Sequence, residues 1–114
     1  MNKMFMRRLL SAAAAFGVCA LASAAESPTT EGHAVFEKWC APCHAPGPGH
    51  PGTTAIAALY KGAKPAALEQ RTDLTPAVVK QFVRKGVSVM PFFRKTEISD
   101  TELDALAAYL AHKG

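Results

Sequence analysis

Five consecutive residues, Cys40-Ala41-Pro42-Cys43-His44, constrain what this chain can fold into more than any other feature. Two cysteines at this spacing suit a redox dithiol, half of a zinc site, or a point where a haem is joined covalently to the chain. Each of these chemistries requires a different fold around the motif. The choice among them therefore depends on what the rest of the sequence places around these five residues.

The surroundings of the motif do not favour a redox dithiol. A thioredoxin-like pair begins a helix that follows a strand. Here Val35, Phe36 and Trp39 are apolar at helical spacing and lead directly into Cys40, with no strand pattern before them. A thiol oxidoreductase stays open as an alternative, and it would leave Cys40 and Cys43 as free thiols.

A structural zinc ion is a second alternative, and it needs four ligands. Cys40, Cys43, His44 and His50 are the candidates that the sequence offers. Adjacent Cys43 and His44 are poorly placed to bind one small ion together, and the chain has no second Cys-x-x-Cys pair. The sequence thus favours zinc less than haem.

The histidine after the second cysteine favours the haem interpretation, because Cys-x-x-Cys-His is the pattern of c-type haem attachment. Thiols at positions i and i+3 of a helical turn point the same way, so Cys40 and Cys43 can reach the two vinyl groups on one side of a porphyrin. His44 then lies below the iron as its proximal ligand. We expect one covalently bound haem c per chain.

The ligand opposite His44 decides whether such a haem carries electrons or reacts with small molecules. Beyond residue 25 the chain has one methionine, Met90, in a loop that is broken by Pro91. We predict that Met90 is the distal iron ligand, which gives a single-electron carrier with no enzymatic activity of its own. A labile sixth ligand would instead indicate a haem ligand sensor or a peroxidase. The remaining histidines lie too close to His44 or at expected surface positions: His50, His33 and His112.

The first 25 residues have the pattern of a secretory signal peptide. Basic residues precede an apolar run from Leu9 to Leu21, and small residues follow it. The run is shorter than the roughly 20 residues that span a bilayer, so we expect cleavage near Ala24 or Ala25 and no stable membrane insertion afterwards. Cys19 leaves with this segment. The expected location is the periplasm, which fits the attachment of bacterial c-type haem outside the cytoplasm.

Cleavage of the signal peptide also changes the length and the net charge of the chain. Residues 26–114 form one domain of about 89 residues, which is short enough to need a cofactor or another staple. The full sequence carries a net charge of +4, but three basic residues leave with the signal, and the remaining ten face nine acidic ones. A chain near +1 gives no reason to expect nucleic acid as a partner.

Three helices are expected along this domain. Thr30 is the predicted N-cap of the first, which runs to Cys40. Residues 45–54, rich in Pro and Gly, are expected to be irregular, with a short helical turn from Ile56 to Tyr60. The second helix is bounded by the cap Thr75, by Pro76 and by Gly86, and its apolar stripe is Val78, Val79, Phe82 and Val83.

The last helix has the clearest signal, because residues 99–102 fit a capping box and Ile98 can pack on Leu103. Leu106 and Leu110 continue its apolar spacing. No strand pair is apparent, so the fold class is all-α. Long loops in so small a domain need an explanation, and a large apolar group in the middle, such as a haem, would supply one.

These residues together resemble the class I cytochromes c over 32–110, through the Cys40–His44 motif, the segment around Met90 and the terminal helix. The resemblance implies a small cytochrome c fold, in which crossing N- and C-terminal helices and one or two further helices, with long loops, surround the haem. It also implies that Gly32 and Phe36 meet Leu106 and Tyr109.

The resemblance further implies that a proline carbonyl holds the proximal histidine, with Pro48 and Pro51 as the two candidates. Chain length and the segment from Met90 to Ser99 also resemble the small cytochrome subunits of p-cresol methylhydroxylase-type flavocytochromes. The implied partners are redox proteins, either a flavin-dependent dehydrogenase that holds this chain as its electron-accepting subunit or a terminal oxidase or reductase. Lys85, Arg94 and Lys95 could steer an acidic partner, or they could be ordinary solvated charges.

Overall fold

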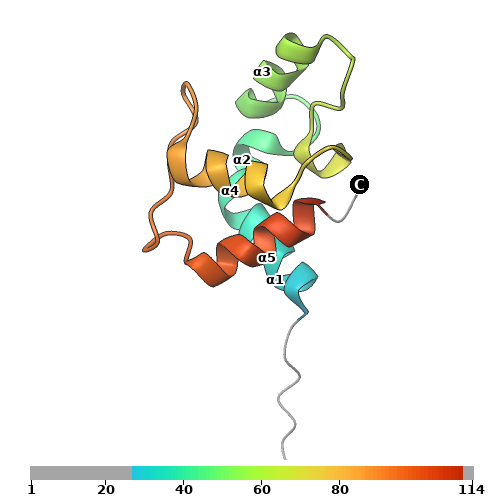
Figure 1. The fold of residues 1–114 in the computed structure, drawn as a ribbon. Coiled ribbons are helices and arrows are strands. Elements are labelled where there is room, and N and C mark those ends of the chain that lie inside the picture. The colour runs from blue at the N-terminus through green and yellow to red at the C-terminus, as the bar shows by residue number, and fades with distance from the viewer. Residues whose placement is uncertain (1–26, 112–114) are drawn as a thin grey trace, which may run out of the picture.

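The computed structural model describes residues 27–111, and its regular backbone is helical. The predicted signal segment 1–25, Cys19 and His112 lie outside the described residues. In chain order the elements are α1 (Pro28–Val35), the π-helical turn η1 (Phe36–Cys40), α2 (Ala41–His44), α3 (Pro51–Tyr60), the 3-10 turn η2 (Leu68–Gln70), α4 (Pro76–Lys85) and α5 (Asp100–Ala111) (Figure 1). The prediction of an all-α domain is confirmed.

The first helix starts earlier than the sequence indicated. Ser27, not Thr30, is the N-cap, and its hydroxyl accepts a hydrogen bond from the Thr30 backbone N–H at 3.4 Å. Pro28 takes the first helical position, where a proline loses no hydrogen bond. Thr30 is therefore inside the helix.

The third helix is longer than expected. The segment predicted to be irregular ends at His50, and α3 begins at Pro51 and continues to Tyr60. The same preference of proline for the first helical turn explains this start. It matters for the site, because it places the N-terminus of a helix directly after the cysteine–histidine motif.

The other two helices follow their predicted boundaries. The Thr75 hydroxyl accepts from the Val78 backbone N–H at 3.3 Å, and Gly86 ends α4 with φ at +66°. At the start of α5 the capping box is complete, since the Ser99 N–H donates to the Glu102 carboxylate at 2.7 Å and the Glu102 N–H donates to the Ser99 hydroxyl at 3.2 Å.

The first and last helices pack against each other, and Gly32 allows their close approach. A Cβ atom at residue 32 would collide with the Ala105 carbonyl oxygen and would lie 2.6 Å from Cβ of Tyr109. The Phe36 and Tyr109 rings have centroids 6.1 Å apart. The predicted meeting of Gly32 and Phe36 with α5 is confirmed.

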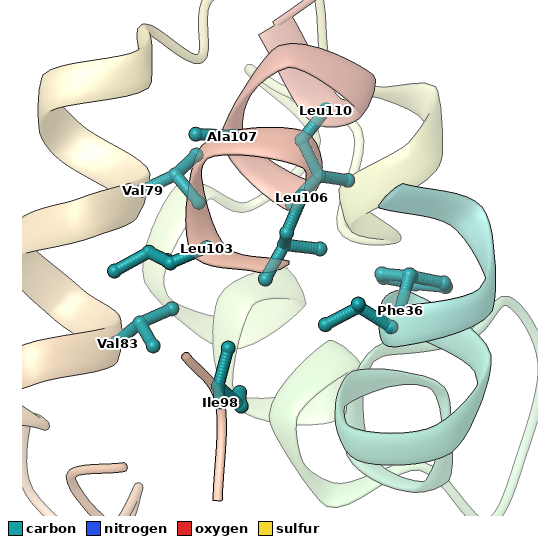
Figure 2. Packing of buried hydrophobic residues seen from close by; sticks show 9 residues of the cluster. Phe36, Val79, Val83, Ile98, Leu103, Leu106, Ala107 and Leu110 are labelled. Carbon is teal, nitrogen blue, oxygen red and sulfur yellow. The ribbon is translucent and has the colours of Figure 1, made fainter. Parts of the chain in front are cut away.

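The hydrophobic core lies between α1, α4 and α5. Figure 2 shows side chains of α4 and α5 facing each other, with Phe36 and Ile98 closing the cluster. Of the predicted stripe on α4, Val79 and Val83 are buried, whereas Val78 and Phe82 are 39% and 41% exposed. The buried cluster is Val35, Phe36, Val79, Val83, Ile98, Leu103, Leu106, Ala107 and Leu110. In residues 27–111 no helix is long and apolar enough to cross a membrane.

Candidate functional site

The cysteine–histidine motif follows the first helix and begins at the last residue of a widened turn. The Ala41 N–H donates to the Phe36 carbonyl, five residues earlier, and the turn Phe36–Cys40 is π-helical. Single π turns of this kind are frequent at functional sites. Nothing in the sequence predicted this turn.

The two cysteines lie in different surroundings. Cys40 is half-buried and Cys43 is exposed. Burial raises the pKa of Cys40 to about 12, with a further contribution from the nearby Cys43. A redox dithiol needs a lowered cysteine pKa, because the thiolate is the reactive form. The surroundings of Cys40 therefore suit an anchor better than a nucleophile.

The His44 ring is packed against Gly52 at the start of α3. A Cβ atom at residue 52 would lie 2.6 Å from Cε1 and 2.7 Å from Nδ1 of His44, so only glycine fits there. Burial lowers the pKa of His44, which favours the neutral imidazole that binds metals. Since the Nδ1 edge faces Gly52, Nε2 is the nitrogen left to bind an iron.

Two side chains of the same region hold the backbone of the motif. Nδ1 of His50 donates to the Pro42 carbonyl at 3.0 Å, and the Thr53 hydroxyl donates to the Ala45 carbonyl at 2.8 Å. The N-terminus of α3 thus forms a cradle, composed of His50, Gly52 and Thr53, beneath the motif. Sequence reasoning missed this cradle, although the Pro51-Gly52 pair was its available signal.

The predicted proline contact to His44 does not form. Nδ1 of His44 is buried and has no hydrogen-bond partner among residues 27–111. Neither the Pro48 nor the Pro51 carbonyl therefore accepts from it. Instead, Pro51 begins the helix whose next residue supports the ring.

Met90 lies in the loop between α4 and α5, as expected. The Val87 N–H donates to the Met90 carbonyl at 3.1 Å, and the Met90 N–H donates to the Val87 carbonyl at 2.9 Å. Gly86 packs against this loop so closely that a Cβ there would lie 2.6 Å from the Met90 carbonyl oxygen. The loop that carries Met90 therefore has a defined backbone.

One ring contact connects the base of this loop to the motif. The Phe93 and Trp39 rings meet edge to face, with centroids 5.8 Å apart, and Trp39 directly precedes Cys40. The structure thus brings the two parts of the predicted site into contact through their neighbours. Within the described residues no hydrogen bond joins Met90 to the motif, so its bond to the iron stays a prediction.

The exposed apolar side chains are confined to the elements around this site. Within residues 27–111, neither α1 nor α5 contributes a large exposed apolar side chain. Those that are exposed come from α3, α4 and the Met90 loop: Leu59, Val78, Phe82, Val87, Val89 and Phe92. A porphyrin needs such apolar surface as well as its ligands, and concentrated exposed apolar surface indicates binding. The two cysteine thiols, the His44 imidazole packed on Gly52 and this apolar surface together fit a haem.

The basic residues proposed for steering are partly engaged within the chain. Arg94 pairs with Glu97 at 3.2 Å, and Lys95 pairs with Asp100 at 2.7 Å. Lys85 is exposed and has no ion pair in the described part of the chain. In that same part, no three His, Cys, Asp or Glu side chains are arranged to hold a metal ion on their own, and a four-ligand zinc site receives no support.

Comparison with known proteins gives one match. A family model described as cytochrome c oxidase, cbb3-type, subunit III covers residues 27–110, which include the motif, its cradle and Met90. No curated protein and no solved structure matches this chain. The narrower likeness to p-cresol methylhydroxylase-type subunits stays a prediction.

Proposed function

Since this chain belongs to the cytochrome c family described as cbb3-type subunit III and is a haem-based electron-transfer protein, we propose that it is an exported monohaem carrier with His44 and Met90 as iron ligands. One observation carries the proposal. The matched region contains both a haem-attachment motif and a single methionine, whose loop is fixed against Gly86 and joined to the motif through Phe93 and Trp39.

Different residues of the chain bind the haem and support the residues that bind it. Cys40 and Cys43 attach the haem, and Gly52 holds the His44 ring while His50 and Thr53 hold the motif backbone. The haem supplies the one-electron redox chemistry. A histidine–methionine pair leaves no open position for a substrate and favours the reduced iron. Electron transfer is therefore the function that this ligand set supports.

The partners of such a carrier are redox proteins. The predicted periplasmic location and the near-neutral mature charge are consistent with exchange between an electron donor and an acceptor, such as a flavin-dependent dehydrogenase or a terminal oxidase or reductase. Of the three basic residues considered for steering, Arg94 and Lys95 are paired internally, which leaves Lys85 to contact an acidic partner.

The ferric absorption spectrum tests the ligand assignment. A methionine thioether on ferric haem gives a weak charge-transfer band in the red, and we expect this band in the native protein. Met90→Ala should abolish it, because the sulfur is removed, while the Soret band and the covalent haem remain. His50→Ala is the matched control for a competing ligand. A red band that persists in Met90→Ala would refute the assignment.

A further inference from the structure

Arg84, in the last turn of α4, binds two backbone carbonyls and one carboxylate of the segment 93–100. Its Nη1 donates to the Phe93 carbonyl at 3.1 Å and to the Ile98 carbonyl at 2.9 Å, and its Nη2 donates to the Asp100 carboxylate at 2.9 Å. The side chain is 23% exposed. Hydrogen bonds from a charged donor are about twice as strong as neutral ones, so this residue is a strong tether.

Phe93 is fixed to α4 through both of its backbone groups. Its carbonyl accepts from Arg84, and its N–H donates to the Val83 carbonyl at 2.8 Å. At the other end of the loop, Gly86 packs against the backbone of Met90 and Phe92. Residues 86–92 therefore form a closed loop, and Met90 lies inside it.

Packing against other parts of the polypeptide in residues 27–111 contributes little to the position of this loop. Val89 is 94% exposed, Phe92 is 60% exposed and Val87 is also exposed. A loop without buried side chains of its own depends on its hydrogen bonds for a fixed conformation. At the C-terminal end of the loop, the hydrogen bonds of Phe93 with Arg84 and Val83 supply this fixation.

We propose that Arg84 is the positioning residue for Met90: by holding Phe93 it keeps the loop closed and directs the methionine sulfur toward the haem iron. The inference rests on the histidine–methionine ligation proposed above. Arg84 would then affect the strength of the methionine–iron bond through Phe93, since its hydrogen bonds in the described residues go to Phe93, Ile98 and Asp100 and not to Met90. Because the Phe93 ring packs on Trp39, which precedes Cys40, a shift of Phe93 would also move the residues next to the motif.

Arg84→Met tests this role, with Arg94→Met as the matched control. Both variants remove an arginine from the same region, but Arg94 pairs only with Glu97. The red charge-transfer band is recorded while imidazole is titrated as a competing ligand of the ferric iron. We expect Arg84→Met to bind imidazole about tenfold or more tightly than the native protein, because a loosened loop holds the sulfur less firmly. Its reduction potential should also fall, while Arg94→Met behaves as the native protein does.

A second variant separates positioning from general stability. Arg84→Lys keeps the charge but offers a single nitrogen for three acceptors, so it should show a smaller effect in the same direction with unchanged helical circular dichroism. Native imidazole affinity and potential in both Arg84 variants would overturn the proposal. So would a band that is lost only together with helical structure. A native protein without the red band would overturn both this inference and the ligand assignment. A red band that imidazole displaces no more readily in the Arg84 variants than in the native protein would overturn the inference alone.

Discussion

The crossing helices and the loops around the haem motif are built in opposite ways. Between α1, α4 and α5 the side chains are apolar and buried, and Gly32 lets two backbones nearly touch. Around α3 and the Met90 loop the large apolar side chains are exposed, and hydrogen bonds to backbone carbonyls fix the chain. The core is thus complete within the polypeptide, while the site half is shaped to cover a flat apolar cofactor.

The comparison implies that changes in the two halves have separable effects. A change in the core should lower the free energy of unfolding and leave the haem spectrum unaltered. A change in the site half should alter haem attachment or ligation first. The variants below, which extend from the largest expected effect to the smallest, test whether this separation holds.

Replacing both Cys40 and Cys43 with alanine should have the largest effect. No thioether bond can then form, so the haem should separate from the chain under denaturing conditions. Intact-mass spectrometry measures this directly. Cys43→Ala alone is the graded control, because Cys40 can still form one bond. A haem that stays attached to the double variant would refute the role of these thiols.

Gly32→Ala tests the core half. The new methyl group would overlap the Ala105 carbonyl and Cβ of Tyr109, so we expect a loss of about 3 kcal/mol in the free energy of unfolding. Chemical denaturation followed by circular dichroism measures it. Ala34→Ser, an exposed position on the same helix, should change stability by less than about 0.5 kcal/mol. An altered haem spectrum in folded Gly32→Ala would contradict the separation of the two halves.

Gly52→Ala makes the corresponding test in the site half. Its methyl group would overlap the edge of the His44 ring, so the imidazole must tilt. We expect a shifted Soret band and a changed reduction potential, with a loss of stability of about 1–2 kcal/mol, smaller than for Gly32→Ala. Thr54→Ala, two residues further along α3 and exposed, is the control. A native spectrum in Gly52→Ala would show that the cradle does not orient His44.

Glu102→Gln should have the smallest effect, and one that depends on pH. Hydrogen bonds from the Ser99 backbone N–H, above all, lower the pKa of Glu102. Its charge therefore stabilises the fold above the ordinary carboxylate pKa, and this contribution is lost as the pH falls through the lowered folded value. At pH 7 the variant should be less stable by about 0.5 kcal/mol, and the difference should shrink as the pH falls below the ordinary carboxylate pKa of about 4.3. An equal difference above and below this pKa would contradict the charge-based explanation.

The sequence predicted those parts of the fold that depend on local signals. Thr75, Pro76 and Gly86 bound α4 because caps act within one turn, and the capping box at Ser99 did the same for α5. The start at Pro51 was missed, because a proline followed by glycine is equally typical of a turn and of a first helical position.

The haem ligands assigned from the sequence stay a prediction, whereas the contacts that support the motif were not predicted at all. The Cys40–His44 motif is a short pattern with a defined chemistry, whereas the contacts of Gly52, His50 and Arg84 depend on how separate segments meet. The expected proline carbonyl for His44 proved wrong for the same reason: its identity depended on the path of the chain after the motif, which spacing alone does not determine.

The most direct test of the central claim is the response of the reduced native protein to carbon monoxide at neutral pH. If His44 and Met90 occupy both axial positions, the haem is closed to small ligands, and the absorption spectrum should not change under the gas. Met90→Ala, treated in the same way, should show a carbon monoxide complex. Ready binding by the native protein would contradict the electron-carrier account and would indicate a haem with a labile sixth ligand.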